Sequence, residues 1–67
     1  MEFTIHINRD NAAFGETEAE RDTETARILH GLANRLEGGV WEAGLKQGHL
    51  LDVNGNKVGV WYKSEND

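Results

Sequence analysis

The sequence predicts a small α+β domain in which one helix packs on a three-stranded, mainly antiparallel sheet. Three observations support this fold. Residues 2–8 alternate apolar and polar side chains, residues 23–37 repeat apolar side chains at the helical period, and Asn54-Gly55 separates two strand-like segments. The elements therefore follow one another as β-α-β-β, and the 67 residues form a single domain, residues 1–67.

The first element is a half-buried strand. Phe3, Ile5 and Ile7 point to one of its faces, while the polar residues between them point to the other. The following segment contains the turn formers Asp10-Asn11 and Gly15 around an apolar group, residues 12–14, which we expect to fold back on the edge of the core.

The second element is an amphipathic helix that Gly38-Gly39 terminates. Its apolar stripe consists of Ala26, Ile28, Leu29, Leu32, Ala33 and Leu36.

The start of this helix is less sharply defined by the sequence. An extension toward the amino end would place Glu18 and Asp22 on the apolar stripe, so we expect the packed helix to begin near Asp22 or Thr23. The alternative is an earlier start, with Thr17 and Glu20 as a capping box.

A loop, residues 40–48, then leads to a hairpin. In the loop, Trp41 and Leu45 are the expected anchors, with Trp41 either filling the core or contacting a partner. A two-residue type I′ turn at Asn54-Gly55 would place Asp52 opposite Lys57 and fix the register of both strands. The face toward the helix would then carry Leu51, Val53, Val58, Val60 and Tyr62.

The opposite sheet face has no layer to cover it, and Leu50 and Trp61 are expected to project from it. If the sheet is antiparallel throughout, the first strand pairs with the last and the order is 1-3-2; parallel pairing of the first two strands is the alternative. The expected core is Phe3, Ile5, Ile7, Ile28, Leu29, Leu32, Leu36, Leu51, Val58 and Val60.

The spacing of Asp52, Asn54 and Asn56 is also that of the first ligands in an EF-hand calcium loop. Such a loop needs Gly at position six and Glu at position twelve, where this chain has Lys57 and Lys63. The hairpin explains the same residues without an ion, so we expect no metal site.

Catalytic motifs are not evident in the sequence. The three His residues lack the short spacing of a zinc motif, Cys is absent, and no glycine-rich phosphate loop occurs. We therefore expect a protein that is not an enzyme and that uses no cofactor.

Net charge restricts the partners. The chain has 7 basic and 12 acidic side chains, giving a formal charge of −5. Direct binding of nucleic acid or of an anionic membrane surface is disfavoured, because both require clustered Lys and Arg. A partner with a basic surface is favoured. The absence of Cys, of a membrane-length apolar run and of a signal peptide leads us to expect a cytoplasmic location.

Two surfaces are candidates for binding a partner. One is the acidic segment formed by Glu16, Glu18, Glu20, Asp22 and Glu24, which is either a solvated helix start or an anionic surface that competes with nucleic acid. The other is the free sheet face with Trp61 and Leu50, which could be a simple cross-strand cluster or a homodimer interface.

Three segments, FTIHINRDNAAF, ETARILHGLANRLEGG and LLDVNGNKVG, resemble small, largely uncharacterised proteins encoded by tailed phages and prophages. The matching residues are Asp10 to Phe14, Ala26 to Leu29 and Asp52 to Asn56. In size and acidity these proteins are similar in kind to anti-CRISPR and other anti-defence inhibitors. The resemblance implies a protein in the host cytoplasm that inhibits a host nucleic-acid-handling complex; a small homodimeric structural or assembly protein is the alternative.

Overall fold

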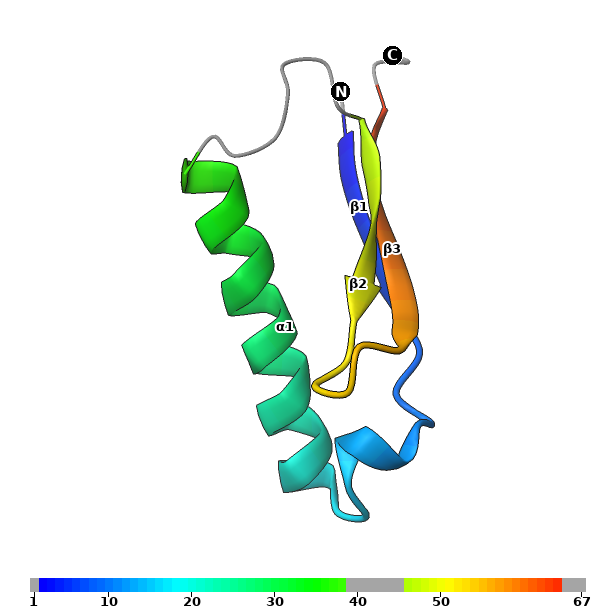
Figure 1. The fold of residues 1–67 in the computed structure, drawn as a ribbon. Helices are drawn as coiled ribbons and strands as arrows, with labels where there is room; N and C mark the ends of the chain where they lie inside the picture. The colour runs from blue at the N-terminus through cyan, green and yellow to red at the C-terminus, as the bar shows by residue number, and fades with distance from the viewer. Residues whose placement is uncertain (1, 39–45, 65–67) are drawn as a thin grey trace.

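The structure, a computed structural model, describes residues 2–38 and 46–64. One helix packs against a three-stranded antiparallel sheet, which is the predicted fold (Figure 1). Along the chain the elements are β1 (Glu2–Ile7), the 3₁₀ turn η1 (Ala12–Phe14), α1 (Glu18–Gly38), β2 (Gln47–Leu51) and β3 (Lys57–Ser64). Trp41 and Leu45 lie outside the described residues.

The strand order is β1-β3-β2, as favoured from the sequence. Ile5 stands opposite Trp61 across the β1–β3 pair, which runs antiparallel. Because β3 separates β1 from β2, the alternative of parallel pairing between the first two strands is excluded. In Figure 1 the helix converges with the sheet toward the β2–β3 turn and diverges from it toward the carboxyl end of α1.

The helix begins earlier than we favoured. The Thr17 hydroxyl accepts a hydrogen bond from the Glu20 amide, and the Glu20 carboxylate accepts one from the Thr17 amide, both at 3.1 Å. This capping box satisfies two amides that the first turn leaves without partners. The predicted start near Asp22 or Thr23 is therefore wrong, and the capping-box alternative is correct.

Arg9 makes the early start possible. Its guanidinium, just after β1, binds the carboxylates of Glu18 at 2.7 Å and Asp22 at 2.9 Å. Glu18 and Asp22 lie on the flank of the helix that faces Arg9, and both stay mostly exposed. At that end they meet a cation rather than an apolar surface, so the helix can continue back to Glu18.

The hairpin register is as predicted away from the turn, where Leu50 pairs with Gly59. The turn itself differs. The Gly55 amide donates to the Asp52 carbonyl at 3.0 Å, and the Asp52 amide donates to the Asn56 carbonyl at 2.9 Å. Gly55 has φ +85°, and no non-glycine residue in the described ranges has a positive φ. The loop is therefore three residues long, a type I turn followed by a left-handed glycine, and not the predicted type I′ turn.

The extra turn residue is compensated by a bulge in β3. Leu51 pairs with Lys57, whereas Leu50 pairs with Gly59, so Val58 is left between them and turns into the core. Lys57 is therefore not opposite Asp52, and the predicted cross-strand charge pair does not form.

Apart from Val58, which the bulge turns into the core, the hairpin faces are the reverse of those predicted. Leu50 is 3% exposed and Trp61 is 1% exposed, so both belong to the core and neither projects from a free face. Trp61 fits because Gly48 stands opposite it: a β-carbon on Gly48 would lie 2.5 Å from the indole nitrogen. The indole also stacks on Phe3, with ring centroids 5.6 Å apart.

The buried core is accordingly smaller than expected and differently composed. Ile28, Leu32 and Val58 are buried as predicted, and Ile7 packs against them. Five expected core residues are 37–46% exposed, namely Phe3, Ile5, Leu29, Leu36 and Leu51. The apolar core consists of Phe14, Ile28, Leu32, Leu50, Val58 and Trp61.

Candidate functional site

The acidic segment is the first predicted binding surface, and most of its carboxylates already have partners within the chain. Glu18 binds Arg9 and also Arg21, the latter at 3.2 Å. Hydrogen bonds from the Arg9 and Arg21 guanidinium groups lower the pKa of Glu18. Asp22 shares Arg9 with it.

Glu20 and Glu24 have structural roles at the two ends of this segment. The amides of Glu16 and Thr17 both donate to the Glu20 carboxylate, which lowers its pKa. Glu24 is only 8% exposed. The Arg27 guanidinium binds both of its oxygens at 2.8 and 2.9 Å and lowers its pKa, and one of those oxygens also accepts the Val53 amide at 3.0 Å.

These contacts reduce the charge that the segment can present. Five carboxylates lie between residues 16 and 24, and three guanidinium groups, Arg9, Arg21 and Arg27, form ion pairs with them, which leaves a local charge of about −2. Of the two interpretations, a helix start describes the segment better than a free anionic surface, and its exposed carboxylates pair with arginines as well as with solvent.

The calcium-like spacing is explained by the turn. One carboxylate oxygen of Asp52 accepts the amides of Asn54 and Asn56, each at 2.8 Å, and the other accepts the Asn56 side chain at 3.3 Å. Burial opposes the ionised form, but these donors from Asn56 and Asn54 outweigh it and keep the pKa of Asp52 below its ordinary value. Asp52 thus organises the turn, and among the described residues no cluster of three or more His, Asp or Glu could hold a metal ion.

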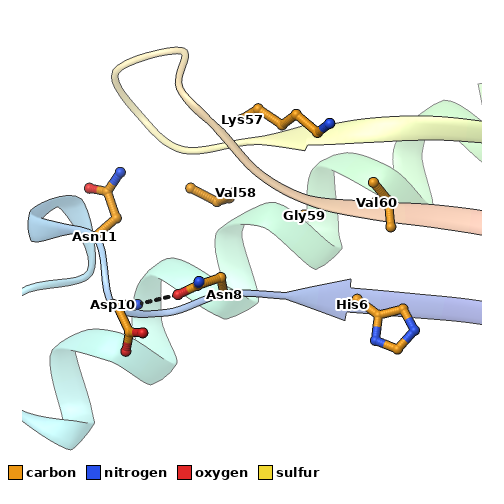
Figure 2. Close-up of a pocket in the computed structure, with 8 residues that line it drawn as sticks. All are labelled: His6, Asn8, Asp10, Asn11, Lys57, Val58, Gly59 and Val60. Atoms are coloured by element: carbon orange, nitrogen blue, oxygen red, sulfur yellow. Dashed lines mark hydrogen bonds between the residues drawn. The ribbon is translucent and has the colours of Figure 1, made fainter.

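A surface depression lies on the sheet face away from the helix, beside the segment that follows β1 (Figure 2). It is lined by His6, Asn8, Asp10, Asn11, Lys57, Val58, Gly59 and Val60. Figure 2 shows these side chains spread along the strands rather than converging on one point. The hydrogen bond drawn there, from the Asp10 amide to the Asn8 side chain at 2.9 Å, stabilises the chain reversal. This geometry holds no pair of side chains arranged as nucleophile and base.

A smaller groove lies between α1 and the β2–β3 turn. Arg27, Gly31 and Arg35 recur at four-residue intervals along its helical wall, and Leu51 and Val53 form part of the opposite wall. Gly31 leaves the groove open, since no atom lies within 4 Å of the place where its β-carbon would be.

A group of exposed apolar side chains lies on the other flank of the helix and on the neighbouring strand. Leu29 and Leu36 follow Asp22 at seven-residue intervals and therefore share the flank that Arg9 contacts, next to β1. Phe3 and Ile5 belong to the face of β1 that carries Trp61 across the strand pair, and so also look toward the helix layer. We call Phe3, Ile5, Leu29 and Leu36 the β1-side apolar surface; these four side chains are 37–42% exposed.

Sequence reasoning missed the residues that shape this surface. Among the described elements the helix contacts the sheet chiefly at β2, which leaves the β1 side only partly covered by α1. One signal was available: in the predicted register Gly48 stands opposite Trp61, and a glycine beside a large aromatic residue marks space for its ring. That pairing would have placed Trp61 and Leu50 inside.

No helix in the described ranges is long and apolar enough to cross a membrane. Comparison of the chain with protein-family models, with curated proteins and with solved structures gave no significant match.

Proposed function

We propose that the protein is a non-enzymatic binding protein that holds another protein on its β1-side apolar surface. The observation that carries this proposal is the exposure of large apolar side chains: among residues 2–38 and 46–64, seven are at least 37% exposed, against six that form the buried core. Four of the seven belong to β1 and to the helix flank on the β1 side, namely Phe3, Ile5, Leu29 and Leu36. Contiguous exposed apolar surface of this kind typically marks a protein interaction site.

The energetics indicate what kind of partner is needed. Complete burial of a Leu, Ile or Phe side chain is worth about 1.5–3 kcal/mol, so covering four side chains that are about 40% exposed would contribute roughly 2–5 kcal/mol. Micromolar affinity requires about 8 kcal/mol. The partner must therefore add contacts beyond the apolar surface, such as main-chain hydrogen bonds.

A matched pair of double variants tests the proposal. Leu29→Gln/Leu36→Gln removes apolar area from the surface, whereas His30→Gln/Asn34→Gln changes two exposed positions on the solvent side of the same helix. Each of the three proteins is used to capture partners from a cell extract, and the captured proteins are quantified. We expect the wild type and the control to capture proteins that the Leu29→Gln/Leu36→Gln variant loses. If capture is identical for all three proteins, the β1-side apolar surface is not the binding site.

A second candidate retains the narrower expectation from the sequence, namely inhibition of a host nucleic-acid-handling complex with a basic surface. It is supported by the net charge of −5 and by the Glu18 and Asp22 side chains, which stay 65% and 63% exposed despite their ion pairs. Binding of this kind slows as salt rises, because exposed charges are screened. Association that is insensitive to salt would exclude it.

The charge test needs a site without a structural role. Glu18 and Glu20 bind Arg9 and the helix cap, so their replacement by Gln would disturb the helix start as well as the charge. Glu16 is exposed, and only its backbone amide takes part in the cap. Glu16→Gln is therefore the cleaner probe, and slower association with an unchanged melting temperature is the expected result.

A further inference from the structure

The outer edge of β1 carries backbone groups that no described strand pairs with. The Asn8 amide donates to the Val58 carbonyl at 2.8 Å, so the backbone groups of Asn8 point toward β3. Along a strand the backbone groups of successive residues point to opposite edges. Even-numbered residues therefore bond to β3, as in the pair of Thr4 with Tyr62. The amides and carbonyls of Phe3 and Ile5 point to the open edge instead.

This edge lacks the features that usually block strand addition. Glu2–Ile7 contains no Pro and no Lys, its pairing with β3 is regular over all six residues, and Phe3 and Ile5 are partly exposed. The opposite edge, β2, is shorter, contains Gly48, loses its regular register at Leu51 and lies closest to the helix. Of the two edges, β1 is the one suited to pairing with another strand.

The sequence of β1 is complementary to itself about Thr4. In an antiparallel pair of two β1 strands centred there, Glu2 stands opposite the partner subunit's His6 and Phe3 stands opposite the partner subunit's Ile5. Thr4 meets its own copy. Aromatic–aliphatic and Thr–Thr cross-strand pairs are favourable, and the Glu2 carboxylate can accept a hydrogen bond from the imidazole of the partner subunit's His6.

The hydrogen-bonding direction agrees with this register. Phe3 and the partner subunit's Ile5 both direct their amide and carbonyl groups across the interface, so each of these pairs exchanges two hydrogen bonds, and Thr4 occupies a non-hydrogen-bonded position. We propose that two copies of the chain associate through their β1 edges, about a two-fold axis at Thr4, to form a continuous six-stranded sheet.

This inference rests on the proposed function, because it names a second copy as the partner of the β1-side apolar surface. A two-fold axis perpendicular to the sheet keeps both helices on the same face. The two uncovered β1 sides then adjoin at the centre, where Phe3 and Ile5 of each copy bury one another. The main-chain hydrogen bonds supply the contacts that the apolar area alone does not.

Single cysteines give the most direct test, because the natural chain contains none. At a non-hydrogen-bonded antiparallel pair the α-carbons lie about 4.5 Å apart, within the range that a disulfide spans. Thr4→Cys should therefore cross-link quickly under mild oxidation. Glu2→Cys, on the same face of the same strand, would be about 13 Å from its own copy in this register and should cross-link at least ten-fold more slowly. His49→Cys reports on the β2 edge and should also be slow.

Charge exchange tests the register without cysteine. Glu2→Lys places a lysine opposite the partner subunit's His6, and His6→Glu places two glutamates opposite one another. Each unfavourable pair occurs twice in the dimer, so each single variant should weaken association by about 2- to 30-fold. The double variant Glu2→Lys/His6→Glu places opposite charges at both positions and should recover the affinity. Sedimentation over a range of concentrations measures the approach to twice the 7.5 kDa mass of one chain.

The outcomes separate this inference from the proposed function. Fast cross-linking at Thr4 together with recovery in the double variant supports the dimer. A monomer at every concentration, or cross-linking no faster at Thr4 than at Glu2 or His49, overturns it. In that case, capture of a different protein that the Leu29→Gln/Leu36→Gln variant loses would still support the proposed function, and failure of both experiments would reject both.

Discussion

At the scale of single residues, Asp52 shows how one carboxylate can organise a turn. It accepts three hydrogen bonds from the residues that follow it, and it is 4% exposed. Asp52→Ala leaves these donors without their acceptor, whereas Asp52→Asn keeps one side-chain oxygen. We expect Asp52→Ala to lower the melting temperature clearly and Asp52→Asn to lower it less. Lys57→Ala is the control: if it destabilises as much as Asp52→Ala, a cross-strand charge pair matters after all.

Replacement by Ala is expected to change the stability of the protein in opposite directions at two glycines. Gly31 lies within α1 with open space around its α-carbon, so Gly31→Ala should stabilise the protein by about 1 kcal/mol. Gly55 has φ +85°, where a β-carbon is strained, so Gly55→Ala should destabilise it by about 1–2 kcal/mol. For a domain of this size, each kcal/mol shifts the melting temperature by about 4–8 °C. Shifts of the same sign would contradict the turn geometry.

At the scale of elements, the start of α1 is tested by two threonines. Thr17→Ala removes the hydroxyl that caps the helix and should cost about 1 kcal/mol. Thr23 lies inside the helix, and its hydroxyl bonds to the Ala19 carbonyl at 3.0 Å, so Thr23→Ala should be neutral or slightly stabilising. Thermal melts of the two variants would be ordered the other way if the helix began at Thr23.

The elements themselves were predictable from local patterns. Alternation gave β1, the 3.6-residue period gave α1, and the hairpin signal placed Leu50 opposite Gly59. These patterns arise from residues that are close in the sequence, and the structure contains the elements that they predict.

What the sequence did not reveal depends on contacts between elements. Both faces of the hairpin offered apolar residues, and the choice was decided by the volume of Trp61 against the space at Gly48. The early helix start required Arg9, which is thirteen residues from Asp22 in the sequence. The β1-side apolar surface exists because α1 approaches the sheet at β2, and no local pattern specifies where a helix crosses a sheet.

At the scale of the whole molecule, the lowered carboxylate pKa values predict sensitivity to acid. Glu18, Glu20 and Glu24 have folded-state pKa values below the ordinary 4.5, and Asp52 lies below 3.8. Their contribution to stability is complete above about pH 4.5 and is lost as the pH falls through the lowered folded values. Unfolding experiments between about pH 6 and pH 2 should show a continuous loss of stability below about pH 4.5. Glu24→Gln should reduce that dependence, and an unchanged slope would mean that the Glu24–Arg27 pair contributes nothing.

The position of β3 between the other two strands has a consequence for how the molecule acquires its shape. Every strand pairing in the described sheet includes Lys57–Ser64, the last strand in sequence order, and the β1–β3 pairing joins residues as far apart as Glu2 and Ser64. Contacts this distant in sequence are formed late and slowly. While the chain is being synthesised, β1 and β2 find no pairing partner among the described strands until β3 emerges, whereas α1 is held by hydrogen bonds within its own segment. During that interval the helix cap stabilises α1 in the nascent chain. The alternating β1 segment then has no partner strand, so it is the segment that could pair with another chain too early.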